Sequence, residues 1–262
     1  MEALKAAGEI DLGDQRLEYR FWGPQPDEAP TLVLLHEGLG CAGLWGDFPE
    51  RLGAAVGAGA FAYSRAGYGG SSTVALPRPL SYMHDEAEHV LPRLLDAIGF
   101  RRGVLVGHSD GASIAAIYAG TCADERLRAI SLLAPHFVVE ALSLQSIAAA
   151  KVAYETGDLR RRLARWHKDV DVAFWGWNRA WLDPGFASWN ISDRLGRVQV
   201  PVQIVQGEAD PYGTILQITL AQETCRLPVA VTLIPAVGHS PQREAPQPTL
   251  DAVAGFCRNA LS

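Results

Sequence analysis

A serine between two glycines is the first feature of this sequence that suggests chemistry. The residues Gly107-His108-Ser109-Asp110-Gly111 follow a short apolar run, GVLVG, and precede the helical pattern GASIAAIYAG. A serine on a tight strand-to-helix turn needs small residues two positions to either side, because larger side chains there would collide. The amide of Asp110, at the start of the helix, can donate to a developing oxyanion. The pattern favours a nucleophilic serine; the alternative is an idle serine in a glycine-rich turn.

A base and an acid are expected just after two predicted strands that come later in the chain. Serine at its ordinary pKa is a weak nucleophile and needs a base, usually a histidine oriented by a carboxylate. Asp210 follows the apolar run VQIVQ, and His239 follows VTLIP. The chain order is therefore serine, acid, histidine, and open α/β sheets place their sites at such strand ends. A free imidazole, with a pKa of about 6.5, suits a general base at neutral pH.

A further oxyanion donor is expected in the turn His36-Glu37-Gly38-Leu39-Gly40, which follows another apolar run. The same region has a second interpretation, because residues 38–43 spell G-x-G-x-x-G and Ser64-Arg65 at the next strand end would suit a 2′-phosphate. That pattern is typical of an NADP-dependent reductase. It is disfavoured because the chain has no Y-x-x-x-K pair and because it leaves the serine, aspartate and histidine unexplained.

The surrounding elements alternate between short apolar runs and helical patterns, which is typical of an α/β fold with a parallel sheet. Several runs are apolar throughout, as expected for strands covered by helices on both faces. Residues 81–99 repeat apolar side chains at helical spacing and predict a crossover helix, with Pro92 as a potential kink. The predicted strands are 8–12, 16–21, 31–36, 60–64, 103–107, 129–133, 202–206 and 231–234.

One segment, residues 137–198, contains helical pattern but no convincing strand, and it holds five of the seven tryptophans. Long insertions in compact domains are often lids or binding elements. We therefore expect a helical cap over a core made of residues 1–136 and 199–262. Its aromatic residues either line the substrate pocket or form the core of the cap itself. The expected pocket residues are His136, Phe137, Trp175 and Trp177.

Composition and charge argue against several classes of protein for this sequence, namely nucleic-acid-binding, disulfide-linked and membrane-spanning proteins. The chain of 262 residues carries 23 basic and 29 acidic side chains, a net charge of −6, so it lacks the basic surface that nucleic acids or anionic membranes attract. The four cysteines form no C-x-x-C pair, which indicates reduced thiols. No apolar stretch approaches the ~20 residues of a membrane span, and no signal peptide is recognised, so a cytoplasmic protein is expected. No pattern predicts an oligomeric state.

Five segments make the sequence similar to the α/β-hydrolases, and the resemblance covers nearly the whole chain. It implies a mostly parallel sheet of eight strands flanked by helices, with a helical cap inserted after the sixth strand. The segments are HEGLG at 36–40, SRAGYGGSS at 64–72, GHSDG at 107–111, GEADPYG at 207–213 and VGHSP at 237–241.

This resemblance also implies roles. Ser109 is then the nucleophile, His239 the base and Asp210 the acid that orients the base, while the amides of Gly38 and Asp110 are the oxyanion donors. No metal and no organic cofactor are implied.

Two positions depart from the usual family pattern. Glu37 stands where glycine is usual, which leaves open whether its own amide or that of Gly38 points inward and whether its carboxylate enters the pocket. Ser64 stands where aspartate is usual, at a supporting position.

The expected function is a serine hydrolase that cleaves a carboxylic ester, or a related acyl bond, of a small apolar or aromatic substrate through an acyl-enzyme. The same triad also serves C–C bond hydrolysis, lactone hydrolysis and lyase reactions. Members of this fold that only bind ligands commonly lose part of the triad, whereas this chain keeps all three residues.

Overall fold

The computed structural model describes residues 3–262 and contains one eight-stranded sheet with the strand order β1-β2-β4-β3-β5-β6-β7-β8. Strands β1 and β2 pair antiparallel, β2 pairs antiparallel with β4, and all other pairs are parallel. The predicted α/β class is confirmed, and each predicted strand is present with ends shifted by at most two residues. The strands are β1 Ala7–Asp11, β2 Arg16–Trp22, β3 Thr31–Leu35, β4 Gly59–Tyr63, β5 Gly103–His108, β6 Leu127–Leu133, β7 Val202–Gly207 and β8 Val229–Ile234.

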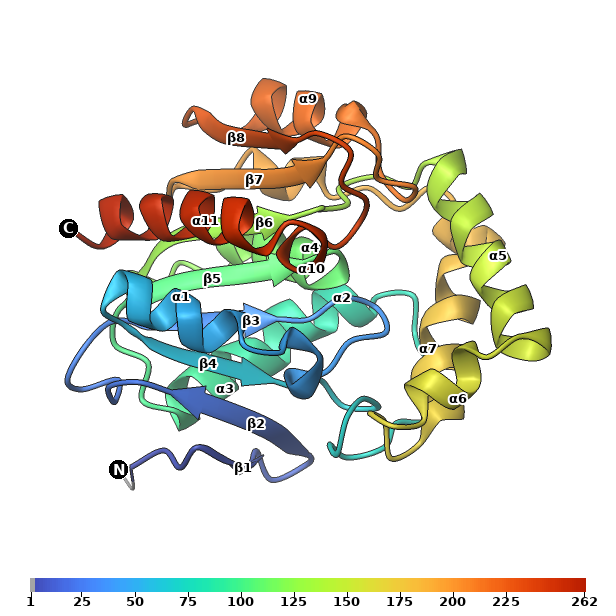
Figure 1. Cartoon of the computed structure of the whole chain (residues 1–262), viewed down its shortest axis with the longest axis horizontal. Helices are drawn as coiled ribbons and strands as arrows, with labels where there is room; N and C mark the ends of the chain where they lie inside the picture. The colour runs from blue at the N-terminus through green and yellow to red at the C-terminus, as the bar shows by residue number, and fades with distance from the viewer. Residues whose placement is uncertain (1–2) are drawn as a thin grey trace.

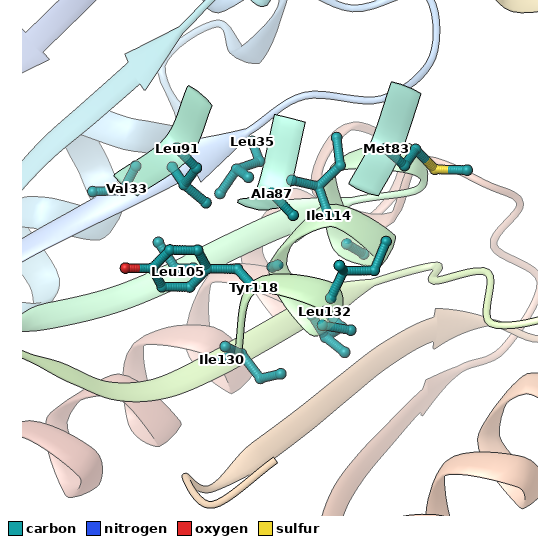
Figure 2. Close-up of a cluster of buried hydrophobic side chains, with 14 of the residues drawn as sticks. Val33, Leu35, Met83, Ala87, Leu91, Leu105, Ile114, Tyr118, Ile130 and Leu132 are labelled. Atoms are coloured by element: carbon teal, nitrogen blue, oxygen red, sulfur yellow. The ribbon is translucent and has the colours of Figure 1, made fainter. Parts of the chain in front are cut away.

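Helices cover both faces of the sheet (Figure 1). On one face α1 (Phe48–Val56) and α11 (Pro246–Leu261) pack over Leu32 and Leu34 of β3. On the other face α3 (Leu91–Ala97), α4 (Asp110–Thr121) and α9 (Ile215–Thr224) pack against the alternate side chains, such as Val33 and Leu35. Figure 2 shows the second cluster, in which Ile114 and Tyr118 of α4 meet Leu105, Ile130 and Leu132 from the strands. The central strands are apolar throughout because both of their faces are covered.

The predicted helix at 81–99 is divided into three parts. A short α2 (Tyr82–Asp85) leads into a π-helical turn, Glu86–Val90, and α3 follows. Pro92 lies in the first turn of α3 and has no amide hydrogen to donate to the preceding turn, so the regular hydrogen-bond ladder is interrupted there. The sequence located this irregularity but predicted a kink rather than a π turn.

The segment after β6 is helical, as its pattern predicts. It contains α5 (Ala141–Thr156), α6 (Leu159–Leu163), α7 (Val170–Trp181), a 3₁₀ turn (Pro184–Phe186) and α8 (Ser192–Leu195). Figure 1 places α5, α6 and α7 beyond the carboxyl ends of the parallel strands, at the right of the view. The short α8 packs instead against α4 and α9. The division of the chain into a core and a cap at residues 137 and 198 stays a prediction.

All four cysteines are free thiols, of which Cys41 and Cys257 are buried. Within residues 3–262, no helix is long and apolar enough to cross a bilayer. In the same part of the chain, no group of three or more His, Cys, Asp or Glu side chains is arranged to hold a metal ion.

Candidate active site

The turn between β5 and α4 exposes Ser109 in an unusual backbone conformation, with φ of 53° and ψ of −118°. Such a conformation in a residue other than glycine costs roughly 1–3 kcal/mol and is typically found at functional sites. The flanking glycines are required by space. A Cβ on Gly107 would lie 2.3 Å from the carbonyl oxygen of Gly111, and one on Gly111 would lie 2.0 Å from that of Leu35. The glycine pattern in the sequence therefore reflects a backbone packed against itself.

The three residues expected to form a triad lie in hydrogen-bond contact. The Nε2 atom of His239 is 2.9 Å from Oγ of Ser109, and its Nδ1 atom is 2.9 Å from each carboxylate oxygen of Asp210. With Nδ1–H donating to the carboxylate, Nε2 is free to accept the serine proton. These residues come from the ends of β5, β7 and β8, so the parallel sheet brings together positions 101 and 29 residues apart in the chain.

Asp210 is held as a carboxylate. Burial alone would raise its pKa, but the hydrogen bond and charge of His239 and the amide of Tyr212, 2.8 Å from Oδ1, lower the pKa below its ordinary value. The side-chain amide of Gln206 donates a further hydrogen bond of 3.2 Å to Oδ2. A carboxylate with these partners keeps the imidazole of His239 oriented with Nδ1–H toward it.

His108, the residue before the serine, forms a hydrogen bond with the backbone of His239, the expected base. Its Nε2 donates to the carbonyl oxygen of His239 over 2.7 Å, and its ring is almost fully buried. The side chain of Gln242 lies 3.0 Å from Nδ1. The bond from His108 to the backbone of His239 is a finding of the structure.

Free amides lie in the turn after β3 and at the start of α4. The amides of Glu37, Gly38 and Asp110 have no acceptor among residues 3–262, so hydrogen bonding within the chain leaves both Glu37 and Gly38 available as the donor from the turn. The turn itself is held by His36, whose Nδ1 donates to the carbonyl of Glu37 over 2.6 Å, and by Arg65, which donates to the carbonyls of His36 and Glu37. Arg65 is 1% exposed. Its guanidinium is thus bound to this turn and is not available for a 2′-phosphate, which removes the basis of the reductase interpretation.

Glu37 does enter the site. Its Oε2 lies 3.4 Å from Nδ1 of His108, and a Cβ on Gly40 would come within 2.4 Å of the same oxygen. Burial alone would raise its pKa, but the hydrogen bond with His108 and the charges of His108 and Arg243 hold the pKa of Glu37 well below its usual range. Glu37 is therefore a carboxylate beside the cavity that also contains Ser109.

Ser64 stands where the family usually has an aspartate, and Glu18 on β2 supplies a carboxylate to this loop instead. The hydroxyl of Ser64 donates to Oε2 of Glu18 on β2 over 2.7 Å and accepts the amide of Ala42 over 2.9 Å. The same carboxylate oxygen accepts the amide of Gly70 over 2.9 Å. A carboxylate therefore still supports this loop, although it comes from Glu18 rather than from position 64.

A cavity of about 190 Å³ lies over Ser109 and His239. The turn residues Glu37 and Gly38 form one wall, and aromatic side chains form much of the rest. None of its lining residues is a lysine or an arginine. The aromatic residues are Trp177, Trp181 and Tyr212, with His136 beside them.

Two of the four expected pocket residues line this cavity and two do not. His136 and Trp177 face it, whereas Phe137 is fully buried in the core. Trp175 packs against Tyr154 and Phe174, with the guanidinium of Arg179 4.9 Å from its ring centre. For Trp175 the reason is helical phase, since residues two apart on α7 point in different directions.

Trp181 also lines the cavity, although it is not among the pocket residues expected from the sequence. It is four residues after Trp177 and therefore on the same helix face, which is the signal that could have found it. Its Nε1 donates to Oδ1 of Asp110 over 3.2 Å, and Tyr82 donates to Oδ2 over 2.5 Å. Burial raises the pKa of Asp110, although the charge of Arg65 and these hydrogen bonds oppose that shift. The residue after the serine is thereby tied to α2 and α7.

His136 remains neutral. Burial, together with the charge of His239, lowers its pKa to about 3, while Asp210 acts in the opposite direction. Its Nδ1 has no partner within the described part of the chain, and its ring centre is 5.5 Å from that of His239. It therefore adds an uncharged polar group to the cavity.

The chain belongs to the Alpha/beta hydrolase family, whose profile matches residues 32–252. It is 25% identical over 233 residues to the 2-hydroxy-6-oxo-6-phenylhexa-2,4-dienoate hydrolase of Comamonas testosteroni, a match that covers 78% of each chain.

Solved structures share the fold. A carboxylesterase structure from Nitrososphaera gargenis has a TM-score of 0.80 at 18% identity and covers 97% of this chain and 98% of its own. The structure of E-2-(acetamidomethylene)succinate hydrolase has a TM-score of 0.75 at 19% identity, covering 95% and 98%. At these identities the likeness shows the fold alone.

Proposed function

We propose that this hydrolase cleaves a carboxylic ester of a small, uncharged acyl compound through a covalent intermediate on Ser109. The observation that carries the proposal is the chain of hydrogen bonds from Ser109 through His239 to Asp210. Gly38 and Asp110, whose amides are unpaired, line the same cavity as Ser109. A nucleophile, a base, an orienting acid and oxyanion donors are the parts that acyl transfer needs.

The reaction proceeds in two halves. Oγ of Ser109 attacks the ester carbonyl while Nε2 of His239 takes its proton, and the amides of Gly38 and Asp110 bind the resulting oxyanion. The tetrahedral intermediate collapses, the C–O bond to the alcohol breaks, and His239 returns the proton to the leaving oxygen. A water molecule then loses a proton to His239, attacks the acyl carbon and releases the acid, which restores Ser109.

The cavity supports a small substrate without negative charge. Its volume of about 190 Å³ is below the ~300–1,000 Å³ of pockets for drug-sized ligands. Its walls are aromatic, which suits an apolar acyl group. The carboxylate of Glu37 and the absence of lysine or arginine from the lining disfavour an acyl group that carries its own carboxylate.

C–C bond hydrolysis is the second candidate, because the curated relative is named for hydrolysis of a phenylhexadienoate. The lining argues against that particular substrate, since a dienoate is an anion and the cavity presents no cationic side chain to it.

A substrate panel tests the proposal. The wild-type protein and Ser109→Ala are assayed with 4-nitrophenyl acetate, 4-nitrophenyl butyrate, γ-butyrolactone and 2-hydroxy-6-oxo-6-phenylhexa-2,4-dienoate. We expect kcat/KM for the esters to exceed that for the dienoate by at least about 100-fold, and Ser109→Ala to lose about 10⁴-fold or more. Faster turnover of the dienoate would establish C–C hydrolysis instead, and an active Ser109→Ala variant would exclude the mechanism.

A further inference from the structure

The side chain of Trp177 lies directly on the turn that carries the expected oxyanion donor. A Cβ on Gly38 would be 2.1 Å from Nε1 of Trp177 and 2.3 Å from its Cδ1, so only glycine leaves room for the indole at this position. Trp177 comes from α7, far from Gly38 in the sequence, and the ring centre of Phe174 lies 6.2 Å away on the same helix. The indole of Trp177 therefore packs directly against the turn of Gly38.

The indole N–H of Trp177 has no acceptor within residues 3–262, and its nitrogen keeps some accessible surface although only 6% of the residue is exposed. An indole N–H in a mostly buried side chain usually has a hydrogen-bond partner. Trp181, one turn along the helix, follows this rule, since its Nε1 donates to Asp110 and lies 3.1 Å from the hydroxyl of Tyr82. The indole nitrogens of Trp45 and Trp189 are also unpaired, but neither of those residues lines the cavity that contains Ser109.

The distance between the two donors permits one shared acceptor. The Cα of Gly38 is about 1.5 Å from its Cβ position, so it lies no more than about 3.6 Å from Nε1 of Trp177. The amide nitrogen of Gly38 is about 1.46 Å from Cα, which puts the two nitrogens within about 5.1 Å. An oxygen about 2.9 Å from each nitrogen requires a separation below about 5.8 Å, so the distance between the two nitrogens meets this requirement.

We propose that Nε1 of Trp177 is a third hydrogen-bond donor to the substrate's acyl oxygen as it becomes an oxyanion. This inference rests on the proposed acyl transfer at Ser109. The oxyanion site is then assembled from three separate parts of the chain: the turn after β3, the start of α4 and the helix α7. Because α7 supplies one donor, the site is complete only while α7 packs on the turn.

The test removes the N–H while keeping an aromatic ring. In Trp177→Phe, kcat for 4-nitrophenyl acetate should fall by about 10- to 100-fold with KM within about threefold, because the lost interaction strengthens as charge develops on the oxygen. The matched control is Trp175→Phe, on the same helix but outside the cavity, which should stay within about twofold of wild type. Affinity for a small trifluoromethyl ketone, whose adduct with serine carries an oxyanion, should fall by the same factor as kcat/KM.

A second variant separates hydrogen bonding from packing. Site-specific replacement of Trp177 by 3-benzothienylalanine keeps the bicyclic shape and lacks the N–H, so it should reproduce the loss in kcat at unchanged melting temperature. Wild-type kcat in this variant, or a loss confined to KM, would overturn the third-donor role. Ser109→Ala is assayed in parallel: if it is inactive the acyl-transfer mechanism stands whatever Trp177 does, and if it is active the mechanism itself fails.

Discussion

Adding one methyl group at position 38 should disable the site without unfolding the protein. In Gly38→Ala the new Cβ would lie 2.1 Å from Nε1 of Trp177, whereas real Cβ contacts essentially never fall below 3.0 Å. The indole or the turn must therefore move by about 0.9 Å. Overpacking of this kind costs about 1–3 kcal/mol of unfolding free energy, which lowers the melting temperature of a domain this size by about 2–6 °C.

The effect on activity should be much larger. A displacement of about 1 Å at a catalytic group can cost about 10²-fold in rate, and the groups in collision are the turn with the amide of Gly38 and the indole N–H of Trp177, both proposed donors to the oxyanion. We expect kcat/KM for 4-nitrophenyl acetate to fall by about 100-fold, measured together with thermal unfolding by circular dichroism. The control is Gly255→Ala in α11, where an added Cβ meets no atom within 4 Å, so activity should be unchanged.

A double-mutant cycle identifies the cause. If the collision with the indole is responsible, Trp177→Ala should restore part of the stability lost by Gly38→Ala, with a coupling of about 0.5–3 kcal/mol. Wild-type activity in Gly38→Ala, or full additivity of the two changes, would refute the claim that the indole fixes this turn.

Three further predictions concern the charged and titratable groups. Asp210→Asn should lower kcat by about 10⁴-fold with the fold intact, because His239 loses the acceptor that orients Nδ1–H; steady-state kinetics within tenfold of wild type would contradict this. Glu37→Gln should raise kcat/KM for 4-nitrophenyl hydrogen succinate relative to 4-nitrophenyl butyrate by roughly 3- to 30-fold, whereas an unchanged ratio would mean that the substrate does not meet this carboxylate. The pKa of His136 is lowered from 6.5 to about 3, so the unfolded state binds one more proton and the free energy of unfolding should fall as pH drops from about 6.5 toward 3. Between pH 7.5 and pH 5, urea unfolding should show a smaller loss of this free energy for His136→Asn than for wild type. Equal losses in the two proteins would argue against a neutral buried imidazole.

Local patterns were sufficient to predict the strands of the sheet. Strands such as β3 are buried on both faces and are therefore apolar at every position, which separates them from the amphipathic helices around them. The glycines beside Ser109 are required by contacts within a few residues of the turn and by β3, so the motif is visible in the sequence. The positions of Asp210 and His239 followed from the rule that parallel strands deliver their carboxyl ends to one edge.

Contacts between distant segments were not predictable in the same way. Whether Trp175 or Trp177 faces the cavity depends on how α7 is rotated against the core, and no local pattern determines that rotation. Glu18 replaces the usual aspartate at Ser64 from a different strand, and Arg65 holds the turn of Glu37 from 28 residues away. These residues could be recognised only once the sheet had placed β2, β3 and β4 side by side.

Covalent labelling tests the central claim, that Ser109 is a nucleophile activated by His239, most directly. The protein is incubated with a small fluorophosphonate and analysed by intact and peptide mass spectrometry. We expect one adduct on Ser109, loss of esterase activity in proportion to labelling, no adduct at this position in Ser109→Ala, and labelling slowed by at least about 100-fold in His239→Ala. Absence of an adduct from the active wild-type protein, or an adduct elsewhere that accounts for the lost activity, would contradict the account.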